Sequence, residues 1–149
     1  MSLLLIAHLI AALIWVGGMF FSYIALRPVL ASIDTLLKLQ IWSQTFQRFF
    51  PWVWLSIITL LVTGFSMIVQ YGGMAEVTLP VHIMLTLGII MMLLFMHLFF
   101  APYKRLHRAV SQQDTALGSA ALNQIRLLIA INLSIGIVVT ISGVLSRFF

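Results

Sequence analysis

The chain contains no cysteine among its 149 residues. That absence excludes disulfide bonds, thiolate metal sites, iron–sulfur clusters and covalently attached c-type haem. Histidine, methionine and carboxylate side chains remain as candidate metal ligands. Any metal site in this chain is therefore built from these three kinds of side chain.

Charge is also scarce, because only 7% of the residues are charged while 62% are hydrophobic. An ordinary soluble domain carries roughly 25% charged residues, so this chain cannot cover a water-facing surface. The composition excludes a soluble enzyme, a disordered chain and a nucleic-acid-binding module, despite a formal net charge of +5. In so apolar a chain, the basic excess indicates membrane topology.

Long apolar runs account for most of the sequence. They cover residues of about 3–26, 52–70, 79–101 and 127–145. Each run exceeds or approaches the ~20 residues that cross ~30 Å of hydrocarbon. Nothing basic precedes the first run, and Trp15 lies in its middle, so we expect a retained helix rather than a signal peptide. The sequence predicts one all-α domain over residues 1–149, an integral membrane four-helix bundle.

The basic residues predict how this bundle is oriented. Seven of the eight flank or lie within the first and third connections: Arg27, Lys38, Arg48, Lys104, Arg105, Arg108 and Arg126. The second connection, residues 70–78, has none, and Arg147 is the single exception. By the positive-inside rule, both termini face outward and the two long connections face the cytoplasm.

The two long connections also contain helical patterns. Apolar residues recur at helical spacing from Thr35 to Phe50, which predicts an amphipathic helix along the inner membrane interface. Pro51 then suits the first turn of the second span. We expect residues 103–124 to extend the third and fourth spans into water, with a break near residues 114–119.

Two histidines inside the spans are the main candidates for function, because ionisable groups in hydrocarbon are costly and commonly functional. His8 and His82 lie at similar outer depths, and Met67 and Met84 are at comparable depth. Imidazole with thioether suits copper, particularly Cu(I), and equally suits axial ligation of haem. Trp15 either stacks on a flat cofactor beside His8 or fills the core. The alternative is that the histidines are polar helix contacts and the methionines packing residues.

Other polar side chains in and near the spans favour structural roles. His97 lies about 22 Å beyond His82 on the same helix, too far to share a metal ion. We expect it to hydrogen-bond to Asn132, and otherwise to be a second cofactor ligand or a proton-relay group. His107 lies among basic residues, where a cluster anchored on anionic lipid is expected. Hydroxyl residues recur along one side of the second span: Ser56, Thr59 and Thr63.

Three segments resemble the copper resistance protein D (CopD) family of small bacterial inner-membrane proteins. They read HLIAALIWVGGMFFSYIALRPVL from His8, VHIMLTLG from Val81 and HLFFAPYKRLHRAV from His97. The most specific part is His-x6-Trp-Val-Gly-Gly. The resemblance implies four spans in the same order, a multi-pass inner-membrane location and a role in copper uptake or tolerance. It further implies that His8, His82 and, less directly, His97 are metal ligands.

The size and the outward-facing histidine of the first helix are also similar to HemJ-type protoporphyrinogen oxidases, which carry b-type haem. The Tyr-x-Pro-Arg-like element of that family is only loosely matched at residues 23–28, and its lysine early in the third helix is absent. We therefore rank a copper-handling membrane protein first, a haem-b redox protein second and an accessory subunit of a larger complex third. An enzymatic activity is left open. Expected partners are the lipid bilayer and either a second copy or another membrane or periplasmic protein.

Overall fold

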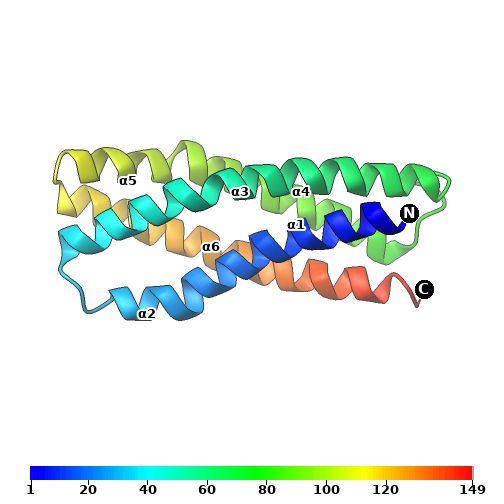
Figure 1. Ribbon diagram of the computed structural model, residues 1–149, viewed down its shortest axis with the longest axis horizontal. Helices are drawn as coiled ribbons and strands as arrows, with labels where there is room; N and C mark the ends of the chain where they lie inside the picture. The colour runs from blue at the N-terminus through cyan, green and yellow to red at the C-terminus, as the bar shows by residue number, and fades with distance from the viewer. Residues whose placement is uncertain (149) are drawn as a thin grey trace.

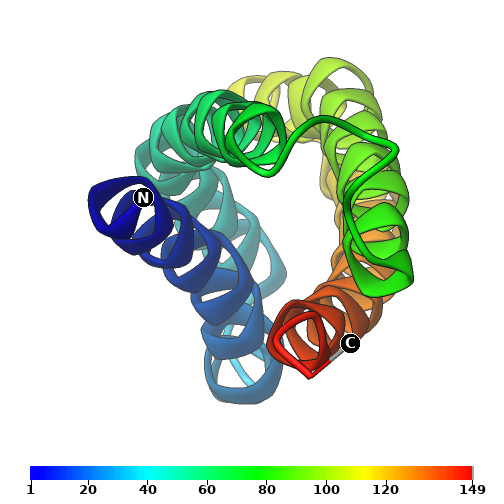
Figure 2. The same cartoon turned by 90° about the vertical axis from the view of Figure 1, so that its right-hand side faces the viewer.

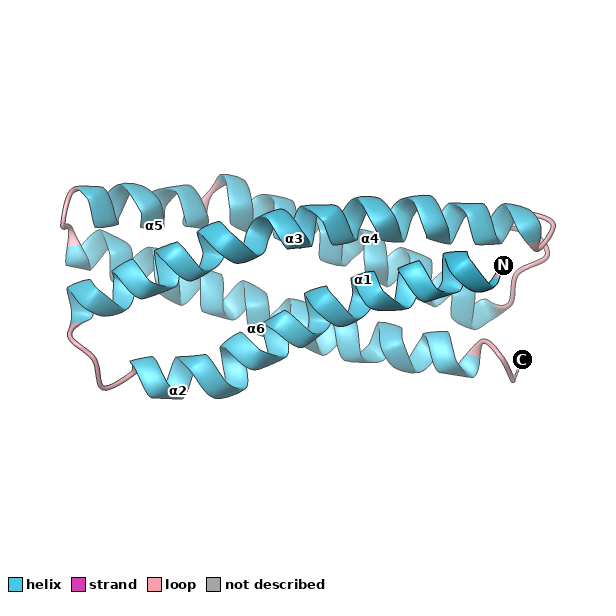
Figure 3. Cartoon of the chain, in the orientation of Figure 1, coloured by secondary structure: helices cyan, strands magenta, loops and turns pink. Residues whose placement is uncertain are grey.

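The computed structural model describes residues 1–148. Its helical segments are α1 (Ser2–Phe21), the π-helix η1 (Ser22–Leu26), α2 (Arg27–Leu30), α3 (Thr35–Gln70), α4 (Leu79–Phe100), α5 (Pro102–Ser111) and α6 (Thr115–Leu145). Because α1, η1 and α2 are continuous, and α5 follows α4 directly, these segments form four long helices (Figure 3). All four are long and apolar enough to cross a membrane. The predicted all-α fold with four spanning helices is confirmed.

The four helices lie side by side along the long axis of the molecule (Figure 1). Both chain ends and the loop of residues 71–78 lie at one end, which we call the terminal end. The loops of residues 31–34 and 112–114 lie at the opposite end, which we call the basic end because seven of the eight Lys and Arg residues occupy that half of their helices. Seen from the terminal end, α1, α3, α4 and α6 follow one another around the axis (Figure 2).

Helix α3 differs from the prediction, because it is a single helix of 36 residues with Pro51 in its interior. The separate interfacial helix expected over residues 35–50 is therefore wrong, as is the placement of Pro51 in a first turn. The apolar face of this segment packs against α5 and α6 instead of lying on the interface. Leu39, Trp42, Phe46 and Phe50 are each at most 4% exposed. Packing on this face holds the helix together across a proline that alone would favour a break.

The connection between α4 and α6 agrees closely with the sequence. A non-helical residue, Ala101, separates α4 from α5, and Pro102 begins the new helix. The chain then reverses through residues 112–114, where Gln113 has a φ of 55°. The Asp114 side chain accepts a hydrogen bond of 3.0 Å from Leu117 N and caps α6. A break was expected near residues 114–119, but it lies at residues 112–114, and residues 115–119 are already part of α6.

The core lies towards the basic end. Counted from the terminal end, the first buried residue of α1 is Ala11 and the first of α4 is Met91. The terminal halves of these two helices therefore contain few fully buried side chains. Phe50 is at the centre of an aromatic cluster, with ring centroids 5.2 Å from Phe95 and 4.8 Å from Tyr103. The bundle is thus closed by aromatic packing at mid-height and more open at the terminal end.

Candidate functional site

His8 on α1 is half-buried at the terminal end, and a threonine of α3 fixes the state of its ring. Its Nδ1 lies 2.8 Å from Thr63 Oγ1. The Thr63 hydroxyl has one proton, which it donates to the carbonyl of Thr59 at 2.6 Å. Thr63 Oγ1 must therefore accept from His8 Nδ1–H. In the neutral ring this leaves the lone pair on Nε2, and orientation of one nitrogen by a hydrogen bond is the usual arrangement of a metal-binding histidine.

His8 also lies against a glycine of α3, Gly64. The His8 Cε1 atom lies 3.4 Å from the position that a Cβ on Gly64 would occupy. The imidazole therefore lies directly over the backbone of α3, beside the hydroxyl that orients it. The row of hydroxyls to which Thr63 belongs is evident in the sequence, but its pairing with His8 was not predicted.

His82 on α4 is the second candidate ligand, and it too is half-buried. It lies four residues into a helix that starts at the terminal end, so both histidines occupy the same end of the bundle (Figure 1). Within residues 1–148, His82 makes no side-chain hydrogen bond, and no contact joins its ring to His8. Helix α1 packs chiefly along α3 and helix α4 along α6, so the two histidines are on different helix pairs.

The methionines predicted beside these histidines are not gathered around one point. Met84 is half-buried and faces α6, with its Sδ 3.5 Å from the position of a Cβ on Gly143. Met67 is half-buried near the end of α3, and Met74 is exposed in the following loop. Among the described residues, no three His, Asp or Glu side chains are close enough to hold a metal ion.

The predicted hydrogen bond between His97 and Asn132 is wrong. Asn132 Nδ2 donates to the backbone carbonyl of Met91 at 3.1 Å, which ties α6 to α4. His97 is exposed, because the neighbouring Phe95 and Leu98 occupy the face of α4 that is buried in the bundle. The case for His97 as a ligand accordingly depends on the family resemblance alone.

His107 contacts the bundle at the basic end. Although the residue is exposed, its Nδ1 lies 3.3 Å from Oγ of the buried Ser43 on α3. The hydrogen bond links α5 to α3. His107 is thus attached to the protein as well as lying among the basic residues of α5.

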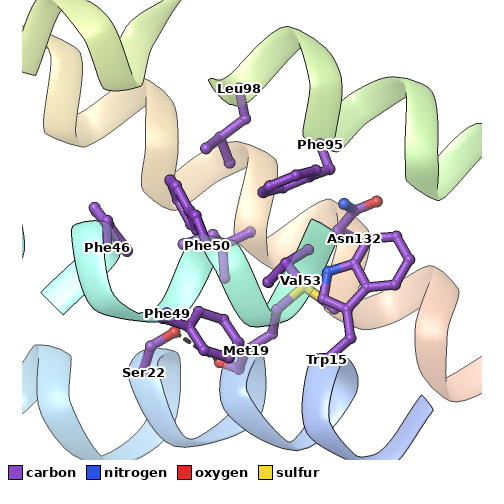
Figure 4. Close-up of a pocket in the computed structure, with 11 residues that line it drawn as sticks. Trp15, Met19, Ser22, Phe46, Phe49, Phe50, Val53, Phe95, Leu98 and Asn132 are labelled. Atoms are coloured by element: carbon purple, nitrogen blue, oxygen red, sulfur yellow. Dashed lines mark hydrogen bonds between the residues drawn. The ribbon is translucent and has the colours of Figure 1, made fainter. Parts of the chain in front are cut away.

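Trp15 belongs to the packed centre of the bundle. It lines a cavity of about 20 Å³ together with ten other residues: Met19, Ser22, Phe46, Phe49, Phe50, Val53, Phe95, Leu98, Ile129 and Asn132 (Figure 4). The indole is 2% exposed and meets Phe95 edge-on, with ring centroids 6.2 Å apart. A cavity of this volume admits about one water-sized group, so in this conformation no planar cofactor has room to stack on Trp15.

Comparison with known proteins provides one match. A family model described as copper resistance protein D (CopD) matches residues 43–145. The matched region begins within α3 and ends with α6, so it includes His82 and His97 and leaves His8 outside. No curated protein and no solved structure significantly matches the chain.

Proposed function

Because the chain belongs to the copper resistance protein D (CopD) family, we propose that it binds copper inside the membrane, at an imidazole site in the terminal half of the bundle. The observation that carries this proposal is the state of His8. The hydrogen bond to Thr63 engages its Nδ1 atom and leaves Nε2 to bind a metal ion. His82 supplies the second imidazole from the opposite helix pair.

The donor set favours Cu(I) over harder ions. Imidazole nitrogen and thioether sulfur are suitable ligands for Cu(I), whereas Ca²⁺ and Mg²⁺ require oxygen ligands. Met84 lies two residues after His82, and Met67 lies four residues after Thr63. The carboxylate nearest in sequence to His82 is Glu76, which is exposed in the loop between α3 and α4. Copper is therefore held by neutral side chains, with His8 and His82 as principal ligands. Met84 faces α6, so it would join them only after a change of its side-chain rotamer.

The bundle below this site supports binding rather than independent transport. Trp15, Met91 and Phe95 close the centre, each at most 3% exposed. The next ionisable group along α4 is His97, which lies on the exposed face of the helix. A copper ion leaving the terminal end would find no continuous row of ligands through the interior. We therefore assign the protein a binding or sensing role, or that of a subunit acting with a membrane or periplasmic partner, in the bacterial inner membrane.

The experiment is an anaerobic competition titration of the purified protein in detergent against a chromogenic Cu(I) chelator. Loss of a group that merely orients a metal ligand costs about 10–100-fold in affinity. We therefore expect His8→Ala and His82→Ala each to weaken Cu(I) binding by at least about 100-fold. His107→Ala, an exposed histidine at the opposite end, is the matched control and should bind Cu(I) as the unmodified protein does.

Two results would contradict the proposal. Equal Cu(I) affinity in all three variants would show that the terminal histidines are not ligands. A Soret band in the absorbance spectrum of the purified protein, lost in His8→Ala, would instead assign the two imidazoles to b-type haem, the second-ranked function. Both measurements use the full chain.

A further inference from the structure

A second cavity, of about 10 Å³, lies at the basic end and brings two arginines together. It lies between η1, α2, α3 and α6, and its lining residues are Ser22, Tyr23, Arg27, Trp42, Phe46, Arg126 and Ile129. None of these residues is acidic. We call this site the arginine cavity. Arg27 and Arg126 come from helices far apart in the sequence, and no residue that lines this space has a carboxylate.

The arginine cavity has buried donors without acceptors. Among the described residues, neither Arg126 Nε nor Trp42 Nε1 has a hydrogen-bond partner, and both atoms are inaccessible to solvent. Arg126 reaches only Asn123 Oδ1, at 3.5 Å through its terminal nitrogen. Trp42 as a whole is 2% exposed. Buried donors of this kind are normally satisfied, because an unmade hydrogen bond costs about 1–3 kcal/mol.

The other polar groups that line the arginine cavity do not supply an acceptor for Arg126 Nε or Trp42 Nε1. The Ser22 hydroxyl donates to the carbonyl of Met19 at 2.9 Å, and its oxygen accepts no hydrogen bond from Arg126 Nε or Trp42 Nε1. The Arg27 guanidinium lies over the Tyr23 ring, 4.8 Å from its centroid, a contact that leaves its N–H groups free to donate. An oxygen with negative charge would satisfy the unpartnered donors and compensate both arginines.

The position of the two arginines along the chain indicates where that anion comes from. Arg27 directly follows the apolar run of residues 3–26, and Arg126 directly precedes that of residues 127–145. Both therefore lie where a hydrocarbon-spanning segment meets the headgroup region. Phosphate groups of lipids are the most abundant anions at that depth, and basic pockets between helices bind them.

We propose that the arginine cavity binds the phosphate group of an anionic phospholipid. The cavity admits one oxygen atom rather than a whole phosphate, so one phosphate oxygen enters between Arg126 and Trp42 while the rest of the headgroup remains at the mouth beside Arg27. The wide turn of η1 places Ser22 and Tyr23 along the wall, as π-helical segments commonly do at functional sites. The site lies at the opposite end of the bundle from His8 and does not depend on copper.

The test measures the thermal stability of delipidated protein in detergent during titration with phosphatidylglycerol, phosphatidylcholine or inorganic phosphate. In the proposed complex a phosphate oxygen accepts hydrogen bonds from Arg126 and Trp42, and both are strengthened by its charge. We therefore expect Arg126→Gln to weaken phosphatidylglycerol binding at least about tenfold. Arg27→Gln is the second variant and removes the other guanidinium without altering α6. Arg126→Lys keeps the charge but loses Nε, and should bind less tightly than the unmodified protein. Arg108→Gln, an exposed arginine of α5, is the matched control and should change the affinity only slightly.

The outcomes separate the possible sources of the phosphate group. Stabilisation by phosphatidylglycerol but not by inorganic phosphate, lost in the Arg126 and Arg27 variants, supports a lipid headgroup. Equal stabilisation by inorganic phosphate, lost in the same variants, supports the phosphate site but overturns its assignment to lipid. If Arg108→Gln weakens binding as much as Arg126→Gln, the attraction is a general effect of basic charge and the proposal is overturned.

Discussion

Thr59 and Thr63 decide which nitrogen of His8 carries the proton. The chain of hydrogen bonds runs from the imidazole to the Thr63 hydroxyl and on to a backbone carbonyl. Because a hydroxyl has one proton, Thr63 accepts from His8 in the tautomer that carries its proton on Nδ1. Threonines that bond to the preceding turn are common in membrane helices, and here the same hydroxyl also orients a side chain of the neighbouring helix.

This contact predicts a coupling between His8 and Thr63 that can be measured without copper. A double-mutant cycle with His8→Phe and Thr63→Val should give an interaction free energy of about 0.6–1.7 kcal/mol, the range for hydrogen bonds between membrane helices. The measurement is unfolding in mixed micelles. The matched cycle uses Thr59→Val, since only the backbone carbonyl of Thr59 takes part and its coupling to His8 should be close to zero. The same coupling in both cycles would show that the hydrogen bond does not form.

Helices α3 and α6 each begin at an aspartate that caps the first turn. Asp114 accepts from Leu117 N at 3.0 Å, whereas Asp34 accepts from Leu37 N at 3.4 Å. The shorter bond is the stronger one. The cap at Asp114 also follows the tight reversal through Gln113 that joins α5 to α6, so it stabilises both the helix and the turn.

Removal of these caps should have unequal effects. We expect Asp114→Ala to lower the free energy of unfolding by about 1 kcal/mol, and Asp34→Ala to lower it by less. Asp114→Asn keeps a side-chain acceptor and should recover most of the loss. Unfolding of the three variants in mixed micelles provides the comparison. A larger loss in Asp34→Ala than in Asp114→Ala would contradict this ranking of the two caps.

The whole molecule consists of two helix pairs that join at mid-height. Helix α1 packs along α3 and α4 along α6, and the pairs meet through the aromatic cluster around Phe50. Both candidate copper ligands lie at the terminal end, and the arginine cavity lies at the basic end. The proposed functions therefore require opposite ends of the bundle to face opposite sides of the membrane.

The distribution of charge predicts that both chain ends face the periplasm. Seven basic residues occupy the basic end, against Arg147 alone at the other. Alkaline phosphatase fused to the C-terminus should be active, while green fluorescent protein at the same position should remain dark. Fusion in the loop of residues 112–114 should reverse both results. An inactive phosphatase with a fluorescent C-terminal fusion would place the copper site on the cytoplasmic side and contradict the orientation.

The sequence by itself determined the fold class, the four spans and the family. These properties depend on local composition, because an apolar run of about 20 residues must satisfy its backbone hydrogen bonds as a helix in lipid. A break in this connection was also predictable from its polar residues, but it was expected at residues 114–119 and lies at 112–114, just before the cap at Asp114. The resemblance to the CopD family was confirmed by a match over residues 43–145, although the motif that first indicated it lies outside that region.

Only the tertiary structure decided which polar groups meet. Helix α4 is apolar on all sides, so its sequence did not reveal that His97 faces outward and that Asn132 bonds to Met91. Pro51 remains within a helix because Phe50 and Val53, on either side of it, are buried by other helices. His8 and Thr63 are 55 residues apart, and their contact depends on the relative rotation of α1 and α3. Such rotations arise from packing between helices, which no single segment encodes.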